Sequence, residues 1–393
     1  MTETNGKKLI LTSNVGSSSI KLVVFETEPS MRPVMHASVE EIGLESCSLL
    51  IKKDREDERH EKVELADHTA AVKLLITRLQ ESFELGELKA VGNRVVFGGP
   101  KLRRTKLLNN ATLAELERNT KFDPEHMPYI LDFIYEFGSQ FSHIQQVLCF
   151  DSAFFADLPK VASMLPIPRK YHAKGVKKYG YHGLSYTYLR DNLKEIGDDQ
   201  ADGRVIMAHL GSGASVTAMV NGKPIDTTMS FTPTSGIPMS SRSGDIDPSI
   251  ASYLMSHEGL SVEEYDSVMN HKSGLIGISE TTSDMHTLID RESSDERAHD
   301  AVNLFCYSVK KAIGSLSAVM GGVDLIVFSG GIGERSAPVR ARICDGLEYS
   351  GIEIDEDKNQ QGFPVISKDD TIRIRVMHTD EESVIAKETL KII

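Results

Sequence analysis

Two stretches of the chain share one pattern of apolar and polar positions. Residues 9–25 (LILTSNVGSSSIKLVVF) and residues 204–220 (RVIMAHLGSGASVTAMV) each contain an apolar run, a short turn of glycine and serine, and a second apolar run. This pattern predicts two strands joined by a tight turn. Because the hairpin occurs once in each half of the chain, we expect two related domains.

The remaining pattern alternates between strand-like and helix-like segments, which is typical of an α/β fold. Strands are expected at 33–41, 48–65, 90–96, 146–150, 371–377 and directly after Asp324. Helices are expected at 66–83, 111–119, 128–141, 186–196, 300–319, after Ser336 and from Glu382 onward. The charged stretch 52–62 is expected to be a solvated loop tip.

Prolines and a basic run at 159–178 mark a change of domain. We therefore expect an N-terminal domain of residues 1–155, completed by the closing helix 382–393, and a C-terminal domain of residues 156–381. The length of 393 residues fits two domains of roughly 150–200 residues each.

The composition is that of a globular, acidic protein, with 40% apolar and 26% charged residues. The formal net charge of −13 argues against nucleic acid or an anionic membrane surface as the main partner. The four cysteines are widely spaced, which favours buried, reduced thiols over disulfides or a metal site. Since no apolar run approaches the roughly 18 residues of a membrane span, we expect a cytoplasmic protein.

The turns of the two hairpins have the composition of an anion-binding loop. Glycine can adopt positive φ and present backbone N–H groups to an anion, while serine adds hydroxyl donors and lysine adds positive charge. The residues concerned are Gly16, Lys21, Gly211, Ser212 and Gly213. Either turn alone could be an ordinary hairpin turn, but the two together favour a site for the phosphates of a ligand.

Eight short motifs occur in the order in which they occur in the acetate kinase family. They are SNVGSSSIKL, NRVVFGG, FDSAFF, YGYHGLS, HLGSGAS, SRSGDIDP, FSGGIGERS and TDEE. The chain resembles that family over nearly its whole length, within the superfamily of acetate and sugar kinases, heat-shock ATPases and actin. The resemblance implies two duplicated actin-like (ribonuclease H-like) domains with mixed sheets flanked by helices, an interdomain cleft, Mg-ATP as phosphoryl donor, and a homodimer.

Transfer of a phosphoryl group to a carboxylate needs no general base, because the acceptor is already an anion at neutral pH. The obstacle is the repulsion between two anions, so catalysis should depend on positioning and on cations. Taken alone, Arg94 and Arg242 would more often form surface ion pairs, and His182 would more often be structural. The resemblance implies a catalytic set of Arg94, Asp151, His182 and Arg242, in which His182 precedes a helix and donates to the transferring group.

The resemblance also implies the residues around the substrates. The magnesium (or manganese) site would use Asn14 and Glu381, since Mg²⁺ keeps most of its waters and needs few protein ligands. Residues expected around the acceptor, a short-chain carboxylate, are Arg94, Val96, Glu125, His126, Tyr181 and Pro233. Residues expected around ATP or ADP are Lys21, His209, Gly211, Ser212, Gly213, Asp284, Met285, His286, Gly331, Ile332, Gly333 and Arg335.

Several positions depart from the family's usual residues. Glu125 stands where an apolar residue usually precedes the histidine matched by His126, and Tyr181 stands in place of a phenylalanine. Either the acceptor is more polar than acetate, or Glu125 points to solvent. Asn93, Phe97 and Phe155 also occupy positions where the family commonly has histidines.

The expected nucleotide site departs as well. Ser283–His286 replaces a usual Asp-Phe-Arg sequence, and Ser212 and Arg335 each replace an asparagine. Met285 can pack on a base, but His286 is a weaker cation than arginine. Pyrophosphate or another nucleotide therefore stays open as donor. A non-transferring, nucleotide-dependent switch is a third reading, which the retained catalytic cations argue against.

Overall fold

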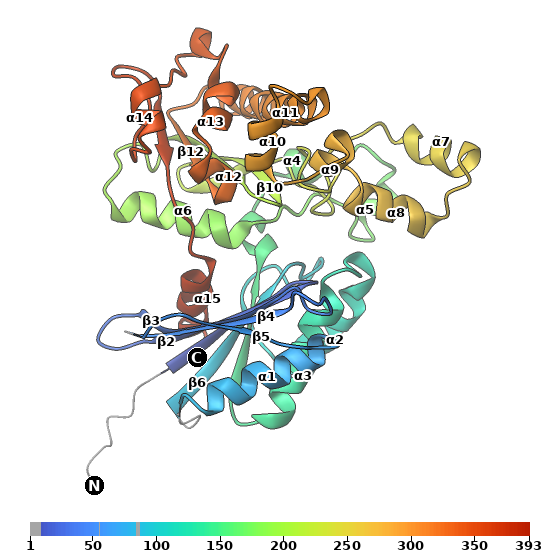
Figure 1. Cartoon of the computed structure of the whole chain (residues 1–393), viewed down its shortest axis with the longest axis vertical. Coiled ribbons are helices and arrows are strands. Elements are labelled where there is room, and N and C mark those ends of the chain that lie inside the picture. Colours follow the sequence, from blue (N-terminus) through green and yellow to red (C-terminus); the bar gives the residue numbers. More distant parts are fainter. Residues whose placement is uncertain (1–8, 55, 84–86) are drawn as a thin grey trace. The chain divides into compact units, whose positions relative to one another are not determined.

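The computed structural model describes residues 9–54, 56–83 and 87–393 (Figure 1). The chain forms two compact units. Unit 1 comprises the chain up to Ala156 together with Asp380–Ile393, and unit 2 comprises Asp157–Thr379. The C-terminal segment thus belongs to the same unit as the N-terminal hairpin.

Within the described residues, unit 1 contains an eight-stranded sheet in the order β5-β4-β3-β2-β1-β6-β8-β7. The strands are β1 (Leu9–Val15), β2 (Ser19–Glu26), β3 (Arg32–Glu40), β4 (Ser48–Lys53), β5 (Arg59–Lys62), β6 (Leu88–Val95), β7 (Lys106–Leu107) and β8 (Gln145–Phe150). Strands β1 to β5 pair antiparallel, whereas β6 runs parallel to β1 and β8 runs parallel to β6.

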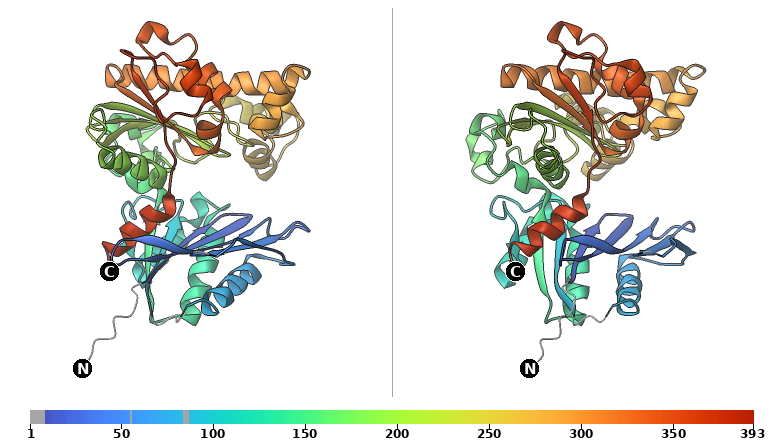
Figure 2. Two further views of the ribbon diagram at one scale, coloured as in Figure 1. Left: turned by 60° about the vertical axis from the view of Figure 1, so that its left-hand side comes forward. Right: turned by 90° about the vertical axis from the view of Figure 1, so that its left-hand side faces the viewer.

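Helices cover both faces of this sheet (Figure 2). They are α1 (His68–Gln80), α2 (Asn110–Asn119), η2 (Thr120–Phe122), α3 (Met127–Gln140), η3 (Asp151–Phe155) and α15 (Glu381–Leu390). Helices α1 and α3 lie on one face and α15 on the other. A Cβ at Gly92 on β6 would lie 2.2 Å from Thr389 Oγ1, so the absence of a side chain there permits α15 to pack closely.

Unit 2 repeats the central part of this topology. Its five-stranded sheet has the order β11-β10-β9-β12-β13 among the described residues. The strands are β9 (Arg204–Leu210), β10 (Ala214–Val220), β11 (Lys223–Thr227), β12 (Leu325–Ser329) and β13 (Arg373–Val376). Because β9–β11 pair antiparallel and β12 and β13 continue in parallel, the sheet matches β3-β2-β1-β6-β8 in order and direction. The expected duplication is confirmed.

The sheet of unit 2 is also covered on both faces, by α6 on one and α11 on the other (Figures 1 and 2). The helices are α4 (Lys160–Ser163), α5 (Arg169–His172), α6 (Gly183–Glu195), α7 (Ser249–His257), α8 (Val262–His271), α9 (Gly274–Ser279), α10 (Met285–Arg291), α11 (Glu296–Met320), α12 (Gly330–Arg335), α13 (Ala337–Cys344), η4 (Glu348–Ser350) and α14 (Glu356–Gln360). The long helix α11 buries Phe305, Val309 and Ile313 along one side.

Both predicted hairpins are confirmed, but three expectations about local structure are wrong. The charged stretch is not only a loop tip, because β5 lies within it and pairs with β4. All four residues of β5 are exposed, so the strand has no apolar alternation to reveal it. The glycine-rich turn expected after β12 is the short helix α12, and the closing helix begins at Glu381 rather than Glu382.

The four cysteines are buried free thiols, as their spacing predicts. Burial raises the pKa of the Cys149, Cys306 and Cys344 thiols to about 12, so they are unreactive structural residues. In the part of the chain that the structure describes, no helix combines the length and the apolar character needed to span a membrane.

Candidate active site

Polar side chains of unit 1 meet at the carboxyl ends of the parallel strands β1, β6 and β8. Arg94 lies near the end of β6, Asp151 directly follows β8, and Asn14 lies near the end of β1. Arg94 Nη2 lies 2.6 Å from Asp151 Oδ2, Arg94 Nε lies 3.1 Å from Asp151 Oδ1, and Arg94 Nη1 donates to Asn14 Oδ1 at 2.8 Å. The guanidinium is therefore held rigidly at an edge of the sheet where α/β proteins commonly bind ligands.

A second carboxylate faces the same guanidinium. Glu381, the first residue of α15, places Oε2 3.9 Å from Arg94 Nε. Burial lowers the pKa of Arg94, but the carboxylates of Asp151 and Glu381 outweigh that effect and the net shift is upward. Burial raises the pKa of the Asp151 carboxyl, and the adjacent guanidinium opposes this shift. One permanent cation thus faces two acidic groups, and when both are ionised the cluster carries negative charge.

The loop before α3 holds the next pair of expected residues. His126 is the N-cap residue of α3, and its Nδ1 lies 2.8 Å from Asp123 Oδ1. Glu125 precedes it and is half-buried. Val96, which directly follows β6, is buried.

The three positions that lack the family's common histidines belong to the packed interior of unit 1. Phe97 and Phe155 are both buried. The Asn93 side chain accepts from Ser13 Oγ at 2.8 Å and donates to Gln146 Oε1 at 3.1 Å. The two phenylalanines therefore fill the core, and the Asn93 amide is hydrogen-bonded by Ser13 and Gln146 within it.

In unit 2, His182 and Arg242 converge on the turn of the second hairpin. A Cβ at Gly213 would lie 3.2 Å from His182 Nε2 and 3.8 Å from Arg242 Nη1. His182 is the N-cap residue of α6 with φ of 60°, an uncommon backbone conformation for a residue with a side chain. The turn, the imidazole and the guanidinium thus surround one small space.

The reason given for the glycines is nevertheless wrong. Gly16, Gly211 and Gly213 all lack a positive φ. At Gly213 the requirement is space, because a side chain would crowd the ring of His182. The positive φ occurs instead at Gly330, at 75°, where a Cβ would lie 2.7 Å from Leu210 O.

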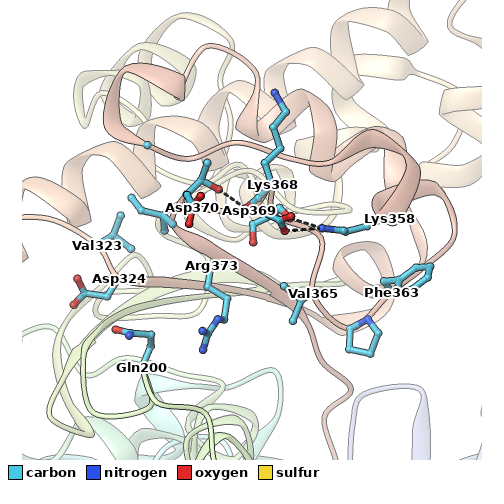
Figure 3. A pocket seen from close by; sticks show the side chains of 15 residues that line it. Gln200, Val323, Asp324, Lys358, Phe363, Val365, Lys368, Asp369, Asp370 and Arg373 are labelled. Carbon is cyan, nitrogen blue, oxygen red and sulfur yellow. Dashed lines mark hydrogen bonds and ion pairs between the residues drawn. The ribbon is translucent and has the colours of Figure 1, made fainter.

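One cavity of unit 2, of about 900 Å³, does not involve any of the expected residues (Figure 3). Its cations are matched by carboxylates. Lys358 Nζ lies 3.2 Å from Asp369 Oδ1, and Lys368 Nζ lies 3.0 Å from Glu353 Oε2. Arg373 Nη1 lies 2.8 Å from Asp198 Oδ1. These pairs stabilise the surface around β13, and the cavity lacks the chemistry of a phosphate site.

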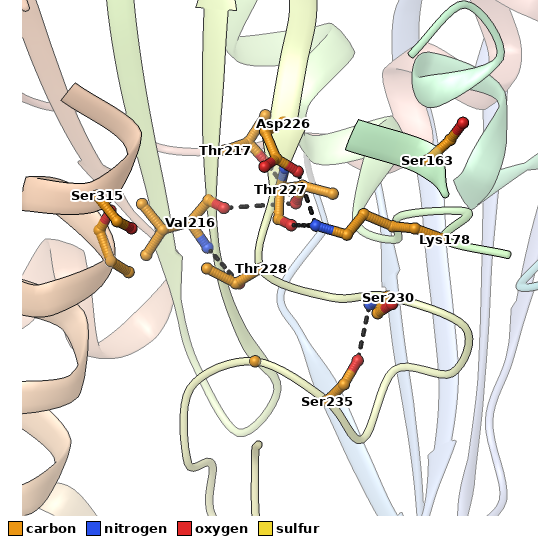
Figure 4. Close-up of polar contacts among 12 residues, drawn as sticks. Ser163, Lys178, Val216, Thr217, Asp226, Thr227, Thr228, Ser230, Ser235 and Ser315 are labelled. Atoms are coloured by element: carbon orange, nitrogen blue, oxygen red, sulfur yellow. Dashed lines mark hydrogen bonds and ion pairs between the residues drawn. The ribbon is translucent and has the colours of Figure 1, made fainter. Parts of the chain in front are cut away.

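Residues 232–248 form an irregular segment that carries Pro233 and Arg242. Hydrogen bonds hold the stretch of chain that precedes it (Figure 4). Lys178 Nζ donates to Asp226 Oδ1 at 2.7 Å and to Thr227 O at 2.9 Å. The Val216 amide donates to Thr228 Oγ1 at 3.0 Å, which fixes the segment to β10. The segment that holds Arg242 is therefore long but not loosely attached.

The hydroxyl group expected from Tyr181 in the acceptor pocket is already engaged. Tyr181 is 3% exposed and donates its hydroxyl to Phe231 O at 2.6 Å. The extra oxygen, compared with phenylalanine, thus ties the chain before α6 to the segment around Phe231. It does not by itself make a pocket more polar.

The helix α12 is held at both ends by charged side chains. The Gly330 amide donates to Glu334 Oε1 at 3.0 Å, and Arg340 Nη1 donates to Gly333 O and Glu334 O at 2.9 Å each. A Cβ at Gly331 would meet no atom within 4 Å, so this backbone is open to a ligand. Ile332, between Gly331 and Gly333, is half-buried. Arg335, the last residue of α12, is exposed.

The other expected nucleotide residues have different environments. Asp284 caps α10 by accepting from the Thr287 amide at 2.8 Å. Met285 is 4% exposed, so little of it is available to a base, and His286 is exposed and 3.1 Å from Asp290 Oδ2. Lys21 is exposed on β2 and pairs in register with Asn14, while His209 pairs in register with Ser215 and Ser329.

Four residues next to these sites escaped the sequence analysis: Tyr186, Ser215, Glu334 and Arg340. They act through side-chain contacts with groups that are not adjacent in the sequence, and only Ser215, at the end of HLGSGAS, and Glu334, within FSGGIGERS, lie in motifs that pointed to their location.

A duplicated mixed sheet, a fixed arginine at the carboxyl ends of one sheet, and glycine-rich backbone beside the other define a phosphotransferase of the duplicated α/β kind. The sequence profile of the Acetokinase family matches residues 9–387. The chain belongs to the acetokinase family, a family that uses ATP as phosphoryl donor, and this makes it a kinase whose phosphoryl acceptor is a carboxylate. The actin-like fold expected from the resemblance is confirmed.

Individual relatives match along almost the full chain. The acetate kinase of Thermoanaerobacterium thermosaccharolyticum is 39% identical over 396 residues and 98% of each chain is covered. The crystal structure of a propionate kinase from Francisella tularensis has a TM-score of 0.92 and 34% identity, covering 98% of this chain and 100% of that one. The crystal structure of Porphyromonas gingivalis acetate kinase has a TM-score of 0.88 and 33% identity, covering 98% and 99%.

Proposed function

We propose that the enzyme transfers the γ-phosphoryl group of Mg-ATP, reversibly and in line, to acetate or another short-chain carboxylate. An acceptor oxygen forms the new bond to phosphorus, the bond to the β–γ bridging oxygen breaks, and ADP leaves with that electron pair. No proton needs to move. The observation that carries the proposal is the Arg94 guanidinium, fixed by Asp151 and Asn14 at the end of β6.

The catalytic residues have distinct tasks in this proposal. Arg94 and Arg242 offset the negative charge of acceptor and transferring group, and His182 donates a hydrogen bond to the same group. Asp151 orients Arg94 through its two oxygens. A protein that only bound nucleotide would not need cations aimed at an acceptor, so the non-transferring switch is the weakest reading.

Asn14 and Glu381 would hold the magnesium ion through its water shell. They supply one amide oxygen and one carboxylate, both hard ligands suited to Mg²⁺, and the ionised acidic cluster around Arg94 favours an added cation. When bound, Mg²⁺ would neutralise part of the negative charge of the donor phosphates. Among the described residues no group of three or more His, Cys, Asp and Glu could hold a metal, and two protein ligands suffice for an ion that keeps its waters.

The identity of both substrates rests on few residues. With the Tyr181 hydroxyl engaged by Phe231 O, a more polar acceptor than acetate is supported by Glu125 alone. On the donor side, the buried Met285 and the ion-paired His286 offer weak contacts to a base, which supports pyrophosphate as the alternative donor.

A hydroxamate assay of acyl phosphate formation tests the proposal. The purified enzyme is incubated with acetate, propionate or short hydroxy acids, each with Mg-ATP or magnesium pyrophosphate. We expect product from Mg-ATP with a short carboxylate. Absence of product with every pair would refute the proposed reaction, and product only with pyrophosphate would select the alternative donor.

Glu125→Leu should raise kcat/KM for acetate and propionate several-fold, on the order of 1 kcal/mol, if the carboxylate lines the acceptor pocket. The reason is that a carboxylate beside the acceptor repels its charge and disfavours its apolar end. Asp132→Leu removes an exposed acid from the adjacent helix α3 and serves as the matched control. An unchanged acceptor profile in Glu125→Leu would place this side chain outside the pocket.

We further propose a homodimer in the cytoplasm. Support for self-association comes from large apolar side chains that are exposed on α7 and α11, among them Tyr253 and Tyr307. Sedimentation velocity of the wild type and of Tyr253→Glu distinguishes a dimer from a monomer.

A further inference from the structure

Three side chains of unit 2 form a hydrogen-bonded chain that ends at His182. His182 Nδ1 lies 2.9 Å from Ser215 Oγ, and Ser215 Oγ lies 2.5 Å from the Tyr186 hydroxyl. Tyr186 lies in the first turn of α6, four residues after the N-cap residue His182, and both side chains contact Ser215. Ser215 lies on β10, two residues after the Gly213 turn.

The chain of hydrogen bonds is shielded from water. Ser215 and Tyr186 are both completely buried. Burial raises the pKa of Tyr186 to about 12, although hydrogen bonds to Ser215, Thr217 and the His209 backbone oppose the shift. The phenol therefore keeps its proton at neutral pH and is a permanent donor.

The relative acidity of the two hydroxyl groups assigns a direction to the hydrogen bonds. The Tyr186 hydroxyl has one proton and two acceptors nearby on Ser215, Oγ at 2.5 Å and the carbonyl oxygen at 3.0 Å. The shorter contact, together with the greater acidity of a phenol than of an aliphatic hydroxyl, directs this proton to Oγ. Ser215 then has its own proton to donate to His182 Nδ1, the other partner of Oγ.

We propose that Tyr186 and Ser215 are positioning residues that hold His182 as the neutral tautomer with its proton on Nε2. Nδ1 accepts from Ser215, so Nε2 carries the N–H. That nitrogen faces the space left by the missing side chain of Gly213, which Arg242 Nη1 also borders. The permanent charge of Arg242 disfavours a second positive charge on the imidazole.

This arrangement deepens the proposed function and rests on it for its catalytic consequence. A neutral Nε2–H donates a hydrogen bond to an oxygen of the transferring group beside the arginine, and no proton is transferred. The opposite tautomer would present a lone pair to that oxygen and repel it. The orientation of one hydroxyl proton on Ser215 thus decides whether His182 assists the reaction or hinders it.

Ring-¹⁵N-labelled histidine reports the tautomer directly in the full-length protein without substrates. The His182 signals are assigned by their loss in His182→Asn. In the wild type we expect the pattern of a neutral imidazole protonated at Nε2, and in Ser215→Ala and Tyr186→Phe a mixture of tautomers. In the hydroxamate assay both variants should lose about ten- to a hundredfold in kcat, with KM values for both substrates unchanged within about twofold.

Tyr179→Phe is the matched control, because Tyr179 is also buried and donates its hydroxyl to a backbone carbonyl, Gly175 O, at 2.7 Å. It should leave the His182 signals and kcat unchanged. A wild-type imidazole protonated at Nδ1 or at both nitrogens would overturn the proposal, as would an unchanged kcat in Ser215→Ala or in Tyr186→Phe. Because the tautomer is measured without turnover, this test of the proposal is independent of the test of the proposed reaction. If one of the variants Ser215→Ala and Tyr186→Phe does not fold, the other provides the same test.

Discussion

Arg94→Ala is expected to lower kcat/KM for acyl phosphate formation at least about 30-fold, corresponding to ~2–3 kcal/mol of transition-state stabilisation. The guanidinium is the one cation that the described contacts of unit 1 fix at the carboxyl ends of β1, β6 and β8, between Asp151 and Asn14. Its removal deletes positive charge where two anions must approach. The measurement is kcat/KM with Mg-ATP and acetate or propionate in the hydroxamate assay.

The same substitution also leaves Asp151 buried without its counter-ion, which destabilises the fold. The double variant Arg94→Ala with Asp151→Asn removes the buried charge and keeps the loss of the cation, so it separates the two effects. Arg118→Ala is the matched control, because the Arg118 side chain is exposed and its buried partner Glu115 keeps a second cation, Lys101; it should stay within about 1 kcal/mol of the wild type. Nearly normal kcat/KM in folded Arg94→Ala would refute the assigned role.

Sequence reasoning succeeded where local pattern and local chemistry agree. The hairpins β1–β2 and β9–β10 were predicted because buried strands flank short turns of small residues, and their registers need no distant partner. Asp151 was predicted at a strand end because an apolar run stops there, and parallel strands then bring it to Arg94. The pattern of apolar and polar residues cannot identify which charged residues belong to the site, and the resemblance to the family supplied that choice.

Sequence reasoning failed where a residue's role depends on a partner far along the chain. Nothing near Tyr181 in the sequence indicates that its hydroxyl donates to Phe231 O, an acceptor 50 residues later. Gly213 was explained by backbone freedom, whereas the packing of His182 and Arg242 around it requires the absence of a side chain. Such contacts depend on tertiary structure, and no pattern within a short window specifies them.

Arg340 is the clearest residue of this kind, because a single arginine on a helix predicts a solvated side chain, yet it is 1% exposed. Its Nε donates to Asn359 Oδ1 at 2.8 Å, and its Nη2 donates to Asn359 O at 3.1 Å. With the two bonds to Gly333 O and Glu334 O, the guanidinium binds α14 to the end of α12. Burial lowers the pKa of Arg340, and the hydrogen bonds in its described contacts go to neutral oxygens.

Arg340→Met is therefore expected to reduce the free energy of unfolding by ~2–4 kcal/mol, because it leaves several buried carbonyl oxygens without a donor. It should also raise KM for ATP several-fold, since the backbone of α12 loses the anchor at its C-terminal end. The matched control is Arg342→Met on the same helix, whose side chain is 32% exposed and pairs with Glu292. This control should cost no more than about 1 kcal/mol.

Urea unfolding of the two variants, followed by circular dichroism, measures the difference, and amide hydrogen exchange of residues 330–335 locates it. Faster exchange in Arg340→Met but not in Arg342→Met is the expected result, because only Arg340 contacts the α12 carbonyls among the contacts described. If both variants unfold at the wild-type urea concentration, the buried guanidinium does not hold the helix. Stability lost without faster exchange would confine its role to the contact with α14, since α12 would then keep its structure without the arginine.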